Sequence, residues 1–133
     1  MSIATVQRIV FVCVENSCRS QIAEAFARLY AGANLEVYSA GSRPSGQVNP
    51  KAIASMAEIG YDLTTHASKS LDDLPKVDFD AAITMGCGDE CPLLRAKQRV
   101  DWGIPDPKHL SPDEFRQVRD LIADRVRALI AGL

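Results

Sequence analysis

Two short stretches of this sequence are apolar almost throughout, and they restrict the fold more than any other feature. Residues 8–13 read RIVFVC and residues 79–84 read FDAAIT. A strand with one solvated face alternates polar and apolar side chains, whereas a parallel strand covered on both faces reads as a nearly continuous apolar run. Residues 35–39 and 99–102 also read as strands. The sequence therefore predicts a four-stranded, mostly parallel sheet.

Helical patterns separate these strands. The apolar residues of the first helix share one face: Ile22, Phe26, Leu29 and Tyr30. A second helix has Asn49 as its cap, Pro50 at its first position and Gly60 at its end. A third begins with the capping box of residues 111–114 and continues with apolar residues at helical spacing. This alternation predicts an α/β fold, an open sheet with helices on both faces, built as a single domain over residues 1–133.

Charge and hydropathy narrow the classes of partner. The 133 residues have a formal net charge of −2, and the basic residues are scattered, so no nucleic-acid partner is expected. No stretch approaches the ~20 apolar residues of a membrane span, and the apolar part of the N-terminus is too short for a signal peptide. A cytoplasmic protein is expected. In a reducing compartment, the four cysteines are poor candidates for static disulfides and favour catalysis, redox exchange or metal binding.

The candidate catalytic residues lie at or just after the ends of the predicted strands. Cys13 ends the first strand, residues 85–87 end the third, and Asp106 follows the fourth. Ligands of open parallel sheets bind outside the carboxyl ends of the strands. We therefore expect these three segments to share one rim of the sheet.

The loop after the first strand reads CVENSCRS, residues 13–20. A tight turn into a helix aims backbone N–H groups and the positive end of the helix dipole at one point, which suits a tetrahedral oxyanion. Arg19 adds a planar pair of donors. The helix start and the cation also favour the thiolate of Cys13, a nucleophile facing its electrophile. An isolated cysteine here would more often be a buried small hydrophobe, but the arginine at this spacing favours catalysis.

The loop matches the C-x5-R-[ST] motif of the low-molecular-weight protein tyrosine phosphatase superfamily. It more closely resembles the arsenate reductase branch, where N-S-C-R-S-Q is typical, and the resemblance continues through residues 38–41, 48–53, 106–107 and 115–120. It implies that Cys13 is the nucleophile and Asp106 the general acid that protonates the leaving oxygen. It also implies an oxyanion cradle formed by Val14, Glu15, Asn16, Ser17, Cys18, Arg19 and Ser20.

Phosphatase and reductase differ in the step that follows the first attack. A phosphatase hydrolyses its phosphocysteine, whereas a reductase needs two electrons, which thiols supply. By the resemblance, Cys87 attacks the Cys13–arsenic adduct, arsenite leaves, and Cys91 then takes over the disulfide from Cys13. We therefore expect reduction of arsenate for arsenic detoxification, with no cofactor.

The reductant is less closely defined by the sequence. Three residues separate Cys87 from Cys91, where thioredoxin-coupled members of the family have six. Thioredoxin is the first candidate partner, and glutathione or mycothiol with a glutaredoxin-type protein is the alternative.

Further expectations concern a cation site and the side chains of Cys18 and His66. Some relatives bind potassium through residues that match Asn16, Glu24 and Ser39 and an aspartate at the position of Lys69. A lysine there disfavours a cation, so no metal is expected. We expect the Cys18 side chain to be a packing residue, and His66 to lie in a loop or at the surface.

Two alternatives come from other classes of function. A phosphatase would hydrolyse phosphomonoesters through a phosphocysteine and would leave Cys87 and Cys91 without a role. A metal-binding module would use all four cysteines, but their C-x4-C and C-x3-C spacings depart from the usual zinc pattern, and Arg19 would lie against the cation.

Overall fold

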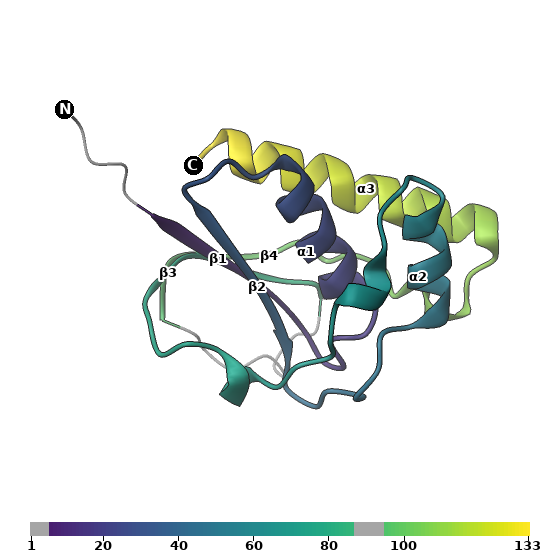
Figure 1. The fold of residues 1–133 in the computed structure, drawn as a ribbon, viewed down its shortest axis with the longest axis horizontal. Helices are drawn as coiled ribbons and strands as arrows, with labels where there is room; N and C mark the ends of the chain where they lie inside the picture. The colour runs from purple at the N-terminus through teal and green to yellow at the C-terminus, as the bar shows by residue number, and fades with distance from the viewer. Residues whose placement is uncertain (1–5, 87–94) are drawn as a thin grey trace.

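The strands form one sheet in which all neighbours are parallel. The computed structural model describes residues 6–86 and 95–133. Their strands are β1 (Gln7–Cys13), β2 (Leu35–Gly41), β3 (Phe79–Thr84) and β4 (Ala96–Asp101). The order across the sheet is β2-β1-β3-β4 (Figure 1). The expected four-stranded, parallel, open sheet is confirmed.

The edge strand β4 differs most from its prediction. It begins at Ala96, which pairs with Phe79, rather than at Arg99, and it ends at Asp101. Lys97 and Gln98 are exposed. An edge strand with solvated side chains lacks the apolar pattern that marks the inner strands, so its first residues could not be recognised from the sequence.

The side chains of β1 alternate between two apolar clusters. Ile9, Phe11 and Cys13 belong to the larger cluster, together with residues of the helices. Val10 and Val12 belong to a smaller cluster on the other face of the sheet. Both faces of β1 are thus buried, which accounts for its continuous apolar sequence.

The three α-helices of the described residues pack on the face of the larger cluster. They are α1 (Arg19–Tyr30), α2 (Pro50–Ala57) and α3 (Pro112–Ala131). Within the described part of the chain, the second face is covered by the 3-10 helix η2 (Leu71–Asp73) and by Leu74 and Val77. Both faces of the sheet are covered, as expected, but the two covers differ. The α-helices pack on one face, whereas the connection from α2 to β3 covers the other with a 3-10 turn.

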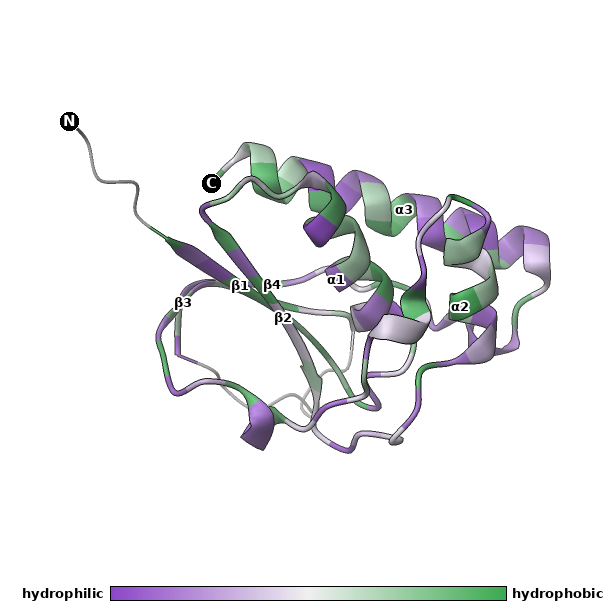
Figure 2. Ribbon diagram, in the orientation of Figure 1, coloured by the Kyte–Doolittle hydropathy of each residue, from purple (hydrophilic) through white to green (hydrophobic). Residues whose placement is uncertain are grey.

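The helix signals in the sequence correspond to real caps. Asn49 Oδ1 accepts the Lys51 N–H at 2.8 Å, and both bonds of the predicted capping box between Ser111 and Glu114 are present. Apolar and hydrophilic segments alternate along α3 (Figure 2). None of the helices in residues 6–86 and 95–133 is long and apolar enough to cross a membrane.

Candidate active site

A cleft of about 150 Å³ opens at the carboxyl ends of the strands, between the loop after β1 and the loop after β4. Its lining is polar and includes both loops: Cys13, Val14, Glu15, Ser17, Cys18, Arg19, Asn49, Asp106 and Lys108. The structure thus brings Asp106 together with Cys13 and Arg19, although Asp106 is distant from both in the sequence.

Cys13 lies at the base of this cleft, where it is 4% exposed. Its Sγ accepts the backbone N–H of Asn16 at 3.2 Å and lies 2.9 Å from Ser20 Oγ. A thiolate has no hydrogen to donate, so with Cys13 ionised the Ser20 hydroxyl is the donor of this contact, and Ser20 Oγ itself accepts a bond from Asn16 Nδ2 at 2.8 Å. Two donors therefore converge on Sγ, an arrangement that stabilises negative charge on a nucleophile.

The start of α1 provides the other side of the cradle. Its N-cap is Cys18, and within the described residues no side chain caps this helix end. The N–H groups of a first helical turn need partners and lie at the positive end of the helix dipole. They are therefore suited to bind the oxygens of an anion held against Cys13.

Arg19 joins three strand ends. Its Nη1 donates to the carbonyl oxygen of Met85 at 2.6 Å and to that of Ile104 at 2.9 Å. Met85 follows β3 directly, and Ile104 lies in the loop after β4. The guanidinium that lines the cleft is thus held by backbone from both neighbouring loops, as the prediction of a shared rim requires.

Asn16 braces the oxyanion loop from behind. It is fully buried and has a left-handed backbone, with φ of 49°, which asparagine tolerates better than most residues. Its amide donates to Ser20 and Ser39, at 2.8 and 3.1 Å, and its Oδ1 accepts the Lys69 N–H at 2.7 Å. The sequence placed Asn16 in the cradle, but its bracing side chain is evident only in the structure.

Gly41, the last residue of β2, allows this loop to approach the sheet. A Cβ at this position would lie 2.5 Å from the Val14 carbonyl oxygen and 2.9 Å from the Asn16 nitrogen. Both neighbours are backbone atoms, so any side chain here would displace the oxyanion loop.

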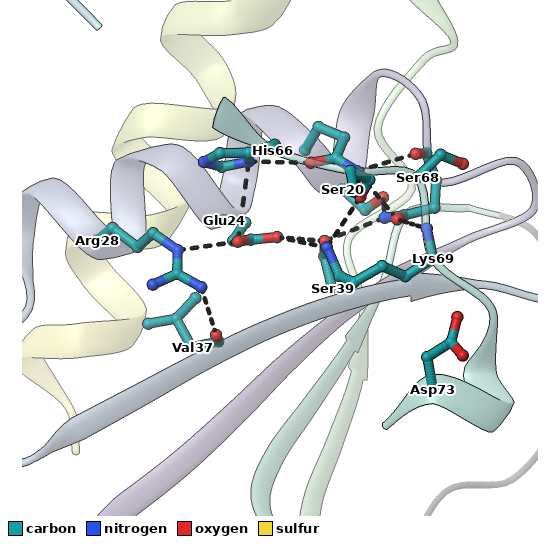
Figure 3. A network of polar contacts seen from close by, with 12 residues as sticks. Ser20, Glu24, Arg28, Val37, Ser39, His66, Ser68, Lys69 and Asp73 are labelled. Carbon is teal, nitrogen blue, oxygen red and sulfur yellow. Dashed lines mark hydrogen bonds and ion pairs between the residues drawn. The ribbon is translucent and has the colours of Figure 1, made fainter. Parts of the chain in front are cut away.

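A buried carboxylate completes the network behind the loop. Glu24 is 3% exposed, accepts a hydrogen bond from Ser39, and lies 2.8 Å from Arg28 Nε and 3.5 Å from Lys69 Nζ (Figure 3). Burial alone would raise the pKa of Glu24, but the Ser39 hydroxyl and the positive charges of Lys69 and Arg28 outweigh it and lower this pKa. The Lys69 ammonium is therefore a positive charge that the chain itself supplies beside Glu24.

His66 lies in a loop, as expected, directly after the 3-10 turn of residues 63–65, but its side chain is buried. That side chain is 4% exposed and lies between Tyr61 Oη, 2.6 Å from Nε2, and Gln21 Oε1, 2.9 Å from Nδ1. Burial lowers the pKa of His66, so the ring is neutral near pH 7. Its neighbours Thr65 and Ala67 are exposed, and no apolar pattern in the sequence signalled the burial.

Cys18 packs as expected. Its side chain is 6% exposed and belongs to the larger apolar cluster. Burial, followed by the negative charges of Asp106 and Cys13, raises the pKa of the Cys18 thiol to about 12. Cys18 is therefore a neutral thiol near pH 7 and a poor nucleophile beside Cys13.

Asp106 lies on the opposite wall of the cleft and is exposed to solvent. It is the N-cap of the 3-10 helix η4 (Pro107–His109), and its Oδ1 accepts the Lys108 N–H at 3.1 Å. Pro107 is buried and fixes this turn to the body of the protein. The carboxyl group thus has a defined position and open access to water.

Cys87 and Cys91 lie outside the described residues. The chain before them is described as far as Gly86, whose N–H donates to Asp101 Oδ1 at 2.7 Å. Among residues 6–86 and 95–133, no group of three or more His, Cys, Asp or Glu side chains could hold a metal ion.

Together, the fold and the cleft define a class of protein: a parallel α/β domain that presents a cysteine nucleophile inside an oxyanion-binding loop, with a carboxyl group across from it. The family described as low molecular weight phosphotyrosine protein phosphatase matches residues 8–133. The chain belongs to this family.

Its relatives include many arsenate reductases. It is 38% identical to the glutaredoxin arsenate reductase of Synechocystis sp., over 96% of this chain and 98% of that protein. It is 41% identical to an arsenate reductase of Halalkalibacterium halodurans, over 90% of this chain and 91% of that protein.

The chain is also similar to solved structures of arsenate reductases. An arsenate reductase in a phosphate-binding state superposes with a TM-score of 0.86 at 37% identity, covering 96% of this chain and 98% of the other. The thioredoxin-dependent arsenate reductase of Corynebacterium glutamicum gives a TM-score of 0.76 at 33% identity, covering 98% of this chain and 63% of the other.

Proposed function

We propose that this protein is an arsenate reductase that acts in the cytoplasm, with residues 1–133 as one domain. The observation that carries the proposal is the convergence of two donors on Cys13 Sγ in a cleft that Arg19 and Asp106 also line. The relatives that share this fold over nearly its whole length are named arsenate reductases, which supports reduction over hydrolysis.

In the first step, the Cys13 thiolate attacks the arsenic of arsenate. A sulfur–arsenic bond forms, and one arsenic–oxygen bond breaks. Asp106 gives its proton to the departing oxygen, which leaves as water, and the carboxylate is reprotonated from solvent. The loop N–H groups and Arg19 hold the remaining oxygens, where negative charge gathers in the transition state.

In the second step, arsenic is reduced. We assign the attack to the Cys87 thiolate, which forms a bond to Cys13 sulfur. The sulfur–arsenic bond breaks with its electron pair left on arsenic, so As(V) becomes As(III) and two thiols become one disulfide. Cys91 then attacks Cys87, which releases the Cys13 thiolate and leaves a Cys87–Cys91 disulfide.

An external thiol must reduce this last disulfide. Thioredoxin is our first candidate, supported by the thioredoxin-dependent neighbour. A glutaredoxin with glutathione, or mycothiol, is the alternative, and the Synechocystis relative carries glutaredoxin in its name. Either partner would reduce the Cys87–Cys91 disulfide by thiol–disulfide exchange, with no other residue of this chain required.

A coupled assay tests the proposal. The purified protein is incubated with arsenate and NADPH, once with thioredoxin and thioredoxin reductase and once with glutaredoxin, glutathione and glutathione reductase, and NADPH oxidation is followed. Oxidation that depends on arsenate is expected with at least one system, and Cys13→Ser should abolish it.

The variant Cys87→Ser separates reduction from hydrolysis. It should stop arsenate reduction and keep hydrolysis of p-nitrophenyl phosphate, which needs only Cys13, Arg19 and Asp106. If neither thiol system couples to arsenate, while p-nitrophenyl phosphate turns over rapidly and Cys87→Ser changes nothing, the protein is a phosphatase and the proposal is rejected.

A further inference from the structure

A partly exposed ion pair joins the two loops that line the cleft. Lys108 Nζ lies 3.4 Å from Glu15 Oε1, and both residues line the cleft. Glu15 belongs to the oxyanion loop and Lys108 to η4, directly after Asp106 and Pro107. The pair therefore connects the loop that holds the anion to the loop that carries the acid, although 93 residues separate its members.

The backbone of Lys108 is fixed, so its side chain starts from a defined point. Its N–H donates to Asp106 Oδ1 at 3.1 Å, and its carbonyl oxygen accepts from Lys51 Nζ at 2.9 Å. On the other side, Ser17 Oγ lies within 3.4 Å of Glu15 Oε2, and Ser68 Oγ donates to the Glu15 carbonyl at 3.0 Å. Both ends of the ion pair are thus anchored by neighbouring polar groups.

The geometry of the reaction shows what this ion pair obstructs. In a displacement at a tetrahedral centre, the leaving oxygen lies opposite the attacking sulfur, and here that places it toward Asp106. A free oxyanion carries only a proton on this oxygen. An ester carries an organic group there, which must leave the cleft past the side chains beside Asp106, where Lys108 reaches across to Glu15.

We propose that Lys108 and Glu15 are specificity-determining residues that narrow the mouth of the cleft and favour a free tetrahedral oxyanion over its organic esters. This inference rests on the proposed oxyanion chemistry at Cys13 and names the substrate class that the cleft accepts. The pair also removes a conflict of charge, because the Lys108 ammonium neutralises a carboxylate that would otherwise face the bound anion.

The test compares two anions that bind without turnover. Inorganic phosphate represents the free oxyanion, and phenylphosphonate represents an ester-like anion that is not hydrolysed. The affinity of each is measured from its protection of Cys13 against alkylation by iodoacetamide, quantified at that residue by peptide mass spectrometry. The selectivity is the ratio of the two dissociation constants, in which effects of charge alone largely cancel.

Four variants address the ion pair. Lys108→Ala and Glu15→Gln should each change the selectivity in favour of phenylphosphonate by about fivefold, the scale of a partly exposed ion pair. The double variant should change it no more than either single variant, because each change alone breaks the pair. Lys108→Arg keeps the charge and should retain the selectivity of the wild type.

Lys97→Ala is the matched control, since Lys97 forms an ion pair of the same 3.4 Å length with Asp80, outside the cleft lining. It should leave the selectivity unchanged. Unchanged selectivity in Lys108→Ala, or additive changes in the double variant, would overturn the role of the ion pair. A wild-type protein in which phosphate gives Cys13 no protection would overturn the oxyanion site itself, and the coupled arsenate assay tests the reductase function separately.

Discussion

The two loops that form the cleft are built in opposite ways. In the oxyanion loop, Asn16 is fully buried and Ser17 is 7% exposed, and side chains from β2 and α1 and the backbone N–H of Lys69 hold the loop from behind. In the acid loop, which follows β4, Asp106 and Lys108 are both exposed, and the buried residues Ile104 and Pro107 connect the loop to the body of the protein. The functional side chains of the first loop are buried in a hydrogen-bond network, whereas those of the second are in solvent and only the backbone around them is held, through the Ile104 and Lys108 carbonyls.

This difference follows from the work of each loop. Donors that stabilise a developing charge must already point at it, because reorganising them during the reaction would cost part of their effect. A carboxyl group that gives up a proton in each cycle must regain one from water, so it needs contact with solvent. Substitutions in the oxyanion loop should therefore change stability and activity together, whereas those in the acid loop should change activity alone.

The largest effect is expected from Arg19→Lys. A lysine cannot reproduce the planar donors or the two bonds from Nη1 to the carbonyls of Met85 and Ile104. We expect kcat/KM to fall about 10³-fold for arsenate reduction and for p-nitrophenyl phosphate hydrolysis alike. Arg127→Lys, on the exposed side of α3, is the matched control, and an equal loss there would show that the effect is not specific to the cleft.

Asp106→Asn tests the acid loop. Asparagine keeps an oxygen that can cap η4 through the Lys108 N–H, so only the exchangeable proton is lost. We expect kcat to fall about 10²-fold, with little change in the free energy of unfolding. A large loss of stability in urea denaturation would contradict the contrast between the loops.

Asn16→Ala tests the oxyanion loop. The change removes the bonds to Ser20, Ser39 and Lys69 and places an alanine at a left-handed φ. We expect the free energy of unfolding to fall by about 2 kcal/mol and activity to fall about tenfold. If activity falls while stability stays at the wild-type value, the bracing network is not what holds this loop.

The smallest effect concerns pH. Because burial lowers the pKa of His66 below its ordinary value of 6.5, its contribution to stability is present above that pH and is lost as the pH falls through the lowered value. Glu24, whose pKa is also lowered, acts in the same direction at more acidic pH. Urea denaturation at several pH values below about 7 should show stability falling with acidity, and less steeply in His66→Gln. If the free energy of unfolding depends on pH equally steeply in the variant and the wild type, His66 does not contribute to this pH dependence.

The sequence predicted the fold where the signal is local. The continuous apolar runs predicted β1 and β3, and the caps at Asn49 and Ser111 predicted the starts of α2 and α3. The C-x5-R spacing predicted Cys13 and Arg19 on one loop, and the carboxyl ends of parallel strands predicted that Asp106 would join them. These inferences needed only neighbours in the chain and the rules of parallel sheets.

The network behind the loop could not be predicted in the same way. Its bonds join residues far apart in sequence, such as Gln21 with His66, separated by 45 residues, and Asn16 with Lys69, separated by 53. Polar side chains in loops carry no periodic pattern, so the burial of the His66 side chain and the position of Lys69 beside Glu24 depend on packing that only the folded chain defines. The roles of Cys87 and Cys91 remain predictions of the sequence, because these residues lie outside the described part of the chain.

The two bonds of the Arg19 guanidinium have a consequence for biosynthesis. Synthesis proceeds from the N-terminus, so the Cys13 loop leaves the ribosome long before Ile104, which lies 85 residues beyond Arg19. Until that residue is available and β4 has docked, Arg19 lacks one of the carbonyls that hold it, and the acid loop does not exist. The nascent chain therefore carries Cys13 before the anion site around it is complete. The site can act on its substrate only after β4 has joined the sheet.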